Sequence, residues 1–231
     1  MTKHAGLPLT SFSKRPVLLT GFEPFAGDAS NPSWEAVSAL DGARVGGRRI
    51  IAKCLPVTFV GAPRALTARL SEHQPALVLC TGLDASRSAV YLERVAVNLA
   101  DASMADNDGF RPVDIPLWKR GPAAYFATAP LKAMRRGLQK LGCPTDISYS
   151  AGTYVCNATF YRLMRALKRR PDARGGFIHV PQPRLEAIER PWAMYPALPL
   201  ELIVEGLRVC VDIALSAVNE SSSNTTESID V

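Results

Sequence analysis

The sequence predicts an α/β fold: a single-domain, three-layer α/β/α sandwich around a mixed, mostly parallel central sheet. Short apolar runs typical of buried strands alternate with longer segments of helical periodicity, which favours helices on both faces of one sheet. The 231 residues are enough for one such domain with a full core. We expect the domain to span residues 15–219, between a flexible segment over 1–14 and a disordered Ser/Thr-rich tail over 220–231.

Six segments are predicted as strands because they are short, apolar and bounded by turn-forming residues. They cover residues 15–20, 49–57, 76–81, 90–98, 146–150 and 177–180. The first runs into a loop rich in glycine, proline and aromatic residues, and Gly82 is expected to end the third.

Five segments are predicted as helices from apolar residues at i, i+3 and i+4 spacing. They begin near residues 32, 60, 131, 156 and 200 and end near residues 40, 73, 141, 170 and 218. Asn31 caps the first of them with proline behind it, and Pro130 and Gly142 bracket the third.

The composition is that of a globular chain without a membrane span. Apolar residues make up 47% and charged residues 21% of the sequence, which is ordinary for such proteins. No apolar run approaches the length of a bilayer, and residues 1–16 lack the apolar stretch of a secretory signal. The net charge is +6, but the cations are dispersed apart from the run 168–170. We therefore expect no membrane and no nucleic acid as partner.

Cysteine and histidine usage indicates a reducing compartment and no metal site. The five cysteines are odd in number and form no C-x-x-C pair, which fits a cytoplasmic location better than a disulfide framework. Cys54, Cys80 and Cys210 lie in apolar segments and are expected in the core. The three histidines are far apart in the sequence, which gives a metal site little support.

Cys156 is the candidate nucleophile. It lies where a small-residue loop turns into a helix, and there unpaired N–H groups and the helix dipole favour the reactive thiolate. Position alone still favours the simpler interpretation that Cys156 is the first buried residue of that helix, since free cysteines are commonly buried.

A thiol nucleophile needs a base and a third group that orients the base. His179 at the end of a strand is the plausible base, since His4 is near the terminus and His73 follows a helix. Glu93 lies in another strand and could be the acid. The pattern leaves open that His179 is a structural hydrogen-bonded residue and Glu93 an ordinary ion-pair partner.

Five segments together resemble the pyroglutamyl peptidase type I (pyrrolidone-carboxylate peptidase) family of cytosolic cysteine peptidases. They are GFEPF at 21–25, ERVAVN at 93–98, GPAAYF at 121–126, SAGTYVCN at 150–157 and GFIHVP at 176–181. They occur in the family's order and span most of the chain. The resemblance implies removal of N-terminal pyroglutamate from peptides with a blocked N-terminus, without a metal or cofactor. Family members often associate, which makes a homo-oligomer an expectation as well.

The resemblance also implies roles for single residues. Cys156 matches the nucleophile, His179 the general base and acid, and Glu93 the acidic third member. Phe22, Phe25 and Tyr154 match aromatic positions that could enclose the flat lactam ring. Their alternative role is to anchor loops against the core.

Two positions depart from the family pattern. After the strand at 76–81, the family has Gly-Gln-Ala-Gly-Gly-Arg where this chain has GLDASR, so Leu83 takes the place of glutamine among the substrate-binding positions. The family's Asp-Ala-Arg is Asp-Ala-Ser here, with Ser103 in place of the arginine. Losing one buried hydrogen bond costs on the order of 1–3 kcal/mol, so Leu83 bears on specificity.

Three hypotheses follow from these observations. The first is a pyroglutamyl peptidase with a Cys-His-Glu triad and an acyl-enzyme intermediate. The second is a related thiol hydrolase whose acyl specificity is altered by Leu83 and Ser103. The third is a catalytically degenerate family member that only binds its ligand.

Overall fold

The computed structural model describes residues 15–183 and 198–220 of the chain, and these contain a mixed seven-stranded sheet. The strand order is β2-β3-β1-β4-β9-β5-β8. The strands are β1 Val17–Phe22, β2 Arg44–Val45, β3 Arg48–Leu55, β4 Leu77–Leu83, β5 Val90–Glu93, β8 Thr145–Ser148 and β9 Arg174–Val180. Four neighbouring pairs are parallel, and β2–β3 and β5–β9 are antiparallel. The predicted mixed, mostly parallel sheet is confirmed.

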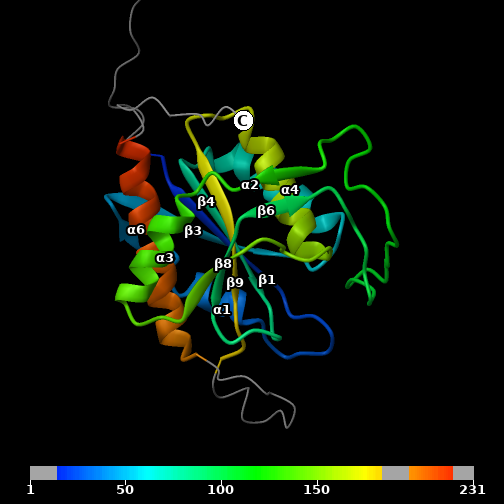
Figure 1. Cartoon of the computed structure of the whole chain (residues 1–231), viewed down its shortest axis with the longest axis horizontal. Coiled ribbons are helices and arrows are strands. Elements are labelled where there is room, and N and C mark those ends of the chain that lie inside the picture. Colours follow the sequence, from blue (N-terminus) through cyan, green and yellow to red (C-terminus); the bar gives the residue numbers. More distant parts are fainter. Residues whose placement is uncertain (1–14, 184–197, 221–231) are drawn as a thin grey trace, which may run out of the picture.

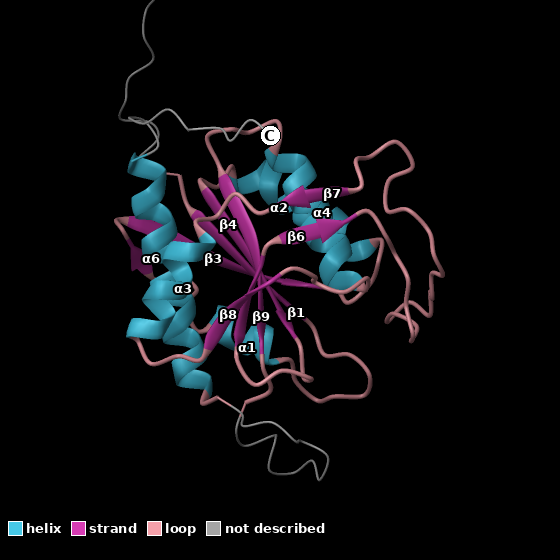
Figure 2. Cartoon of the chain, viewed as in Figure 1, coloured by secondary structure: helices cyan, strands magenta, loops and turns pink. Residues whose placement is uncertain are grey.

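Helices cover both faces of this sheet (Figures 1 and 2). They are α1 Pro32–Ser38, α2 Gly61–His73, α3 Leu131–Lys140, α4 Val155–Leu167 and α6 Leu200–Glu220. Helices α2 and α4 pack together on one face, while α3 and α1 both pack against α6 on the other. The three-layer architecture is therefore confirmed.

The expected terminal segments fall largely outside the described residues. Residues 1–14 and 221–231 are not described, whereas residue 220, where the tail was expected to begin, is the last residue of α6.

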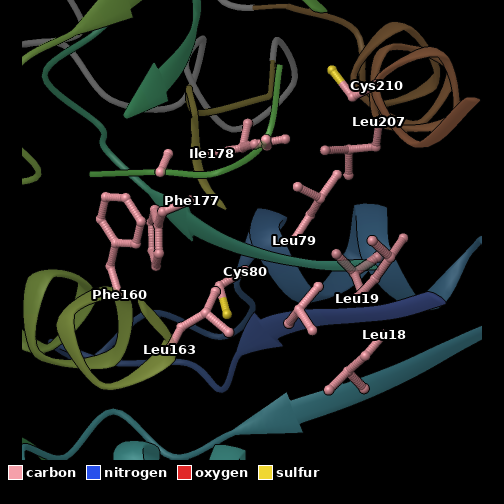
Figure 3. Close-up of a cluster of buried hydrophobic side chains, with 14 of the residues drawn as sticks. Leu18, Leu19, Leu79, Cys80, Phe160, Leu163, Phe177, Ile178, Leu207 and Cys210 are labelled. Atoms are coloured by element: carbon pink, nitrogen blue, oxygen red, sulfur yellow. The ribbon is translucent and has the colours of Figure 1, made fainter. Parts of the chain in front are cut away.

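The central strands read as continuous apolar runs because side chains are buried on both of their faces. Every residue of β1 is buried, and β4 and β9 are each buried over six of their seven residues. Figure 3 shows Phe160 of α4 beside Phe177 of β9, with Leu207 and Cys210 of α6 in the same cluster. Two fully buried rings, Phe160 and Phe177, therefore pack where α4 meets the sheet.

The start of α1 is fixed as the sequence predicts. Asn31 caps the helix by accepting a hydrogen bond from the Ser33 N–H at 3.0 Å, and Pro32 follows it. Gly21 of β1 is needed here, because a Cβ atom at this position would lie 2.5 Å from the Ser33 carbonyl oxygen. This close approach holds the loop after β1 in place.

Cysteine burial follows the prediction except at one position. Cys80 and Cys210 are buried, but Cys54 is exposed and its prediction as a core residue is wrong. Cys54 lies on the same face of β3 as the buried residues Ile50 and Ala52, because side chains alternate along a strand. It is near the carboxyl end of β3, and there this face is exposed to solvent.

The strand predicted over 90–98 is broken in two. β5 ends at Glu93, and β6 (Val95–Val97) leaves the main sheet to pair with β7 (Ala124–Phe126), a strand that the sequence did not reveal. The break at residue 94 leaves Glu93 at the end of a sheet strand, facing the neighbouring β9.

β4 also runs further than expected. Gly82 was predicted to end the strand, yet it pairs with His179 and is followed by Leu83 as the last strand residue. The extension brings the carboxyl ends of β4 and β9 side by side.

Candidate active site

His179 and Glu93 face each other across an antiparallel pair of strands. His179 lies on β9 and Glu93 ends β5, with register partners Glu93–Phe177 and Tyr91–His179. His179 Nδ1 and Glu93 Oε1 are 2.8 Å apart, and both side chains are buried. A carboxylate on Nδ1 leaves the other ring nitrogen, Nε2, as the atom free to exchange a proton with a nucleophile.

Cys156 completes the arrangement from the first turn of α4. Its thiol lies close enough to His179 to interact with the imidazole. Burial alone lowers the pKa of His179, but hydrogen bonds and charge interactions with Cys156 and Glu93 outweigh it and raise this pKa to about 10. The imidazole is therefore protonated at neutral pH.

Gly82 leaves the space that the thiol occupies. A Cβ atom at position 82 would lie 2.7 Å from Cys156 Sγ and 2.9 Å from Phe177 Cζ. Since Gly82 is also the register partner of His179, the absence of a side chain there lets the sulfur approach the imidazole.

The amino terminus of α4 presents unpaired N–H groups beside the thiol. Tyr154 caps the helix without a side-chain hydrogen bond, and the Ala158 N–H reaches the Tyr154 carbonyl at 3.1 Å. The N–H groups of Val155 and Cys156 come before that bond and have no carbonyl one turn earlier to donate to. They are suited to a developing oxyanion. The helix begins one residue before Cys156, close to the predicted position.

Asn157 fixes this end of α4 to the neighbouring strand. Its buried amide accepts from the Val97 N–H at 2.9 Å and donates to the carbonyls of Val97 at 2.9 Å and Leu99 at 3.0 Å. The residue after Cys156 thus helps to set the position of the helix.

A narrow cavity of about 50 Å³ opens beside the thiol. All four predicted substrate-binding residues line it together with Cys156: Phe22, Phe25, Leu83 and Tyr154. Phe22 also serves as an anchor, because it is 3% exposed and its ring centre is 6.4 Å from that of Phe177.

Three residues that the sequence did not single out for this role complete the lining: Asn31, Val57 and Val155. Asn31 was recognised only as a helix cap, and its amide oxygen indeed accepts from Ser33 while its nitrogen donates to the Glu23 carbonyl.

The polar loop over 101–111 is hydrogen-bonded to the residues just before α4. Tyr154 Oη donates to the Ala105 carbonyl at 3.0 Å, and Thr153 Oγ1 donates to the Asp101 carbonyl at 2.6 Å. The Tyr154 ring packs edge-on against Phe59 with centres 5.3 Å apart. Ser103, where the family has arginine, is exposed on this loop.

Arg87 is a cation near the site that sequence reasoning missed. Its Nη1 lies 3.9 Å from Glu93 Oε1, its Nε donates to Asp84 at 2.8 Å, and its guanidinium stacks on the Tyr91 ring. The i,i+3 spacing from Asp84 was a local signal, but the sequence did not show that the turn after β4 brings Arg87 to Glu93.

The described part of the chain offers neither a metal site nor a membrane span. Within residues 15–183 and 198–220, no three His, Cys, Asp or Glu side chains gather as metal ligands would. The same ranges contain no helix with the length and apolar content needed to cross a bilayer.

The thiol of Cys156, the imidazole of His179 and the carboxylate of Glu93 lie next to one another in space, beside the amino terminus of a helix in an α/β fold. This arrangement defines the class of cysteine hydrolases. Comparison with known proteins narrows that class. The family model described as pyroglutamyl peptidase matches residues 15–217, and this chain belongs to that family.

Relatives and solved structures agree with the assignment. Pyrrolidone-carboxylate peptidase of Cupriavidus taiwanensis is 50% identical over 202 residues, covering 87% of this chain and 93% of the relative. The crystal structure of pyroglutamyl peptidase I from Bacillus amyloliquefaciens superposes with a TM-score of 0.83 at 39% identity, covering 87% and 97% of the two chains. Pyrrolidone carboxyl peptidase from Thermococcus litoralis gives 0.86 at 32% identity, covering 93% and 100%.

Proposed function

We propose that this chain removes an N-terminal pyroglutamyl residue from peptides, with Cys156 as nucleophile, His179 as general base and acid, and Glu93 as the residue that orients His179. The observation that carries the proposal is the contact of His179 with both Glu93 and Cys156, beside a small apolar cavity.

The reaction begins with attack of the Cys156 thiolate on the pyroglutamyl carbonyl carbon. The carbonyl oxygen becomes an oxyanion, which the N–H groups at the start of α4 stabilise. His179 then gives its proton to the peptide nitrogen, the C–N bond breaks, and the shortened peptide leaves with a free amine. A thioester between pyroglutamate and Cys156 remains.

Hydrolysis of the thioester regenerates the enzyme. Neutral His179 takes a proton from water, and the resulting hydroxide attacks the thioester carbonyl. The C–S bond breaks, pyroglutamate is released as a carboxylate, and Cys156 returns as a thiolate beside protonated His179. Glu93 keeps the imidazole oriented in both halves of the cycle.

The cavity lining supports a blocked N-terminus as the preferred group. Phe22, Phe25 and Tyr154 supply aromatic walls for a flat ring. Among the described residues, no carboxylate lines the cavity, so a free ammonium group would be buried there without a counter-charge, which is costly. An uncharged lactam avoids that cost.

Release of a fluorophore from a pyroglutamyl amide tests the proposal. Wild-type protein should turn the substrate over, and Cys156→Ala should lose at least about 10⁴-fold in kcat/KM because no nucleophile remains. Cys54→Ala is the matched control, since it removes an exposed thiol on β3 and should leave the rate unchanged. No turnover by wild-type protein at high enzyme concentration would contradict the proposal.

A second candidate keeps the same nucleophile with another acyl group. Leu83 lines the cavity and brings no side-chain hydrogen-bonding group to it. A panel of small N-acyl and N-terminal residue amides decides between the candidates. Turnover better than with pyroglutamate would favour the altered specificity, and a clear preference for pyroglutamate would exclude it.

A binding protein without catalysis is separated from both by thiol reactivity. Fast, pH-shifted labelling of Cys156 by iodoacetamide supports catalysis, whereas labelling no faster than a free model thiol supports a binding role.

We further infer a homo-oligomer and a cytoplasmic location. Phe110, Val113 and Ile115 are large apolar side chains exposed in one stretch, which favours association. All five cysteines are free, as in a reducing compartment. Sedimentation at several concentrations and fractionation of cells test the two inferences; a concentration-independent monomer would contradict the first, and recovery outside the cytoplasm the second.

A further inference from the structure

A second cavity lies between α2 and α4, apart from the one beside the thiol. Its volume is about 310 Å³, within the range of small-molecule sites. Arg64 of α2 and Arg162 and Arg165 of α4 line it. An adjoining hollow of about 240 Å³ shares Arg162 and Arg165 and adds Arg169 and Arg170. The two hollows form one basic trough along α4, which lies beside α2 in Figure 1; we call it the α4 trough.

The positive charge of the α4 trough is not balanced by its own lining. Within the part of the chain that the structure describes, no aspartate or glutamate lines either hollow. Burial, and then the charge of Arg165, lower the pKa of Arg162. The positive charges of Arg162 and Arg165 therefore repel each other. An anion bound between the two guanidinium groups relieves this repulsion.

Three of the five guanidinium groups, those of Arg162, Arg165 and Arg170, are already held in place. Arg162 Nε donates to Thr67 Oγ1 at 2.8 Å, and Arg170 Nη1 donates to the Leu70 carbonyl at 2.9 Å. The Arg165 guanidinium lies 3.6 Å above the centre of the Trp118 ring. Side chains fixed in this way lose little conformational entropy when they bind a ligand.

The larger cavity also has apolar and aromatic lining, beside its arginines. Phe59, Leu117, Trp118 and Tyr161 form it, and the Tyr161 hydroxyl is already engaged with the Pro122 carbonyl at 2.8 Å. A ligand that satisfies both kinds of lining combines a multiply anionic group with a flat and largely apolar body.

We propose that the α4 trough binds a small molecule that carries phosphate groups on a flat heterocyclic body, of the nucleoside phosphate class. Several guanidinium forks suit a multiply charged phosphate better than a single carboxylate. The concave shape favours a small ligand over an extended acidic polypeptide, which would need an open surface. Binding at this site is independent of the proposed peptidase activity.

Calorimetric titration of the full chain with ADP tests the proposal, with inorganic phosphate and adenosine as half-ligands. ADP should bind saturably, one per chain, with a Kd at least about tenfold below that of either half-ligand, since the arginines and the aromatic side chains both contribute. Arg64→Gln and Arg165→Gln should each raise the Kd for ADP about tenfold or more. Arg64 is exposed, so its replacement leaves the fold intact.

Arg136→Gln is the matched control. Arg136 is exposed on α3, on the other face of the sheet, and its loss changes the net charge equally. It should leave the Kd within about twofold. Absence of saturable ADP binding would overturn the proposal, as would an equal effect of the control or binding of phosphate alone as tight as ADP. Displacement of ADP by a lower concentration of an oligoglutamate peptide would overturn it in favour of an acidic protein partner.

Discussion

Replacement of Gly82 by alanine tests whether the close approach of β4 sets the position of the Cys156 thiol. The new Cβ would lie 2.7 Å from Cys156 Sγ and 2.9 Å from Phe177 Cζ. Non-bonded heavy atoms favour separations of about 3.5–4.0 Å, so one neighbour must move by about 1 Å. Phe177 is fully buried against Phe160, so we expect the sulfur to move.

A shift of about 1 Å at a reacting atom costs on the order of 10²-fold in rate. The same substitution overpacks the sheet by about 1–3 kcal/mol, which lowers Tm by several degrees at roughly 2–4 °C per kcal/mol. The assay is kcat/KM for a fluorogenic pyroglutamyl amide at a temperature well below the Tm of the variant.

Gly206→Ala separates strain at the thiol from strain in general. Its Cβ would lie 2.9 Å from Leu138 Cδ2, between α6 and α3 on the other side of the sheet. This variant should keep kcat/KM within about twofold, because the new Cβ lies on the other side of the sheet and shares no neighbour with Cys156. Full activity of Gly82→Ala, or equal losses in the two variants, would refute the reasoning.

Three further predictions concern the imidazole, the helix anchor and the cavity. Although burial lowers the pKa of His179, its partners raise it to about 10; kcat/KM should therefore fall only as pH rises through about 10. The stability that the His179–Glu93 pair contributes should be fully present below the ordinary histidine pKa of about 6.5 and should be lost as pH rises from there through about 10. A loss of kcat/KM or of stability that is complete near pH 6.5 would contradict the assignment. Asn157→Ala leaves three partly buried backbone groups without their side-chain partner and should lower the unfolding free energy in urea by about 1–3 kcal/mol, an unchanged midpoint being the contrary result. Leu83→Gln should raise pyroglutamyl kcat/KM about five- to a hundredfold if the lactam lacks a partner; a loss of activity would argue against that pocket.

The sequence predicted the sheet and the five helices, and it pointed to side chains that the structure places close together. The central strands are buried on both faces, so their apolar runs stand out, and the capping signals at Asn31 and Pro32 are local. Cys156, His179 and Glu93 were identified through family motifs, and the structure brings them together as expected. The four predicted cavity residues also lie together.

Features that depend on distant pairing could not be found in this way. The break after Glu93 arises because β6 pairs with β7, whose residues lie beyond a long loop. β2 and β7 contain two and three residues, too few to show a periodicity. Arg87 reaches Glu93 through the turn after β4, where it also pairs with Asp84, and the sequence did not show the path of that turn. The larger cavity of the α4 trough needs Arg64 of α2 beside α4.

Trapping of the acyl-enzyme tests the central claim most directly. Wild-type protein mixed with a pyroglutamyl amide and quenched in acid within one turnover should carry a pyroglutamyl group on the peptide that contains Cys156, as detected by mass spectrometry. Glu93→Gln, which disorients His179, should form and hydrolyse this thioester more slowly. Turnover with no adduct on Cys156, or turnover that survives in Cys156→Ala, would contradict the account.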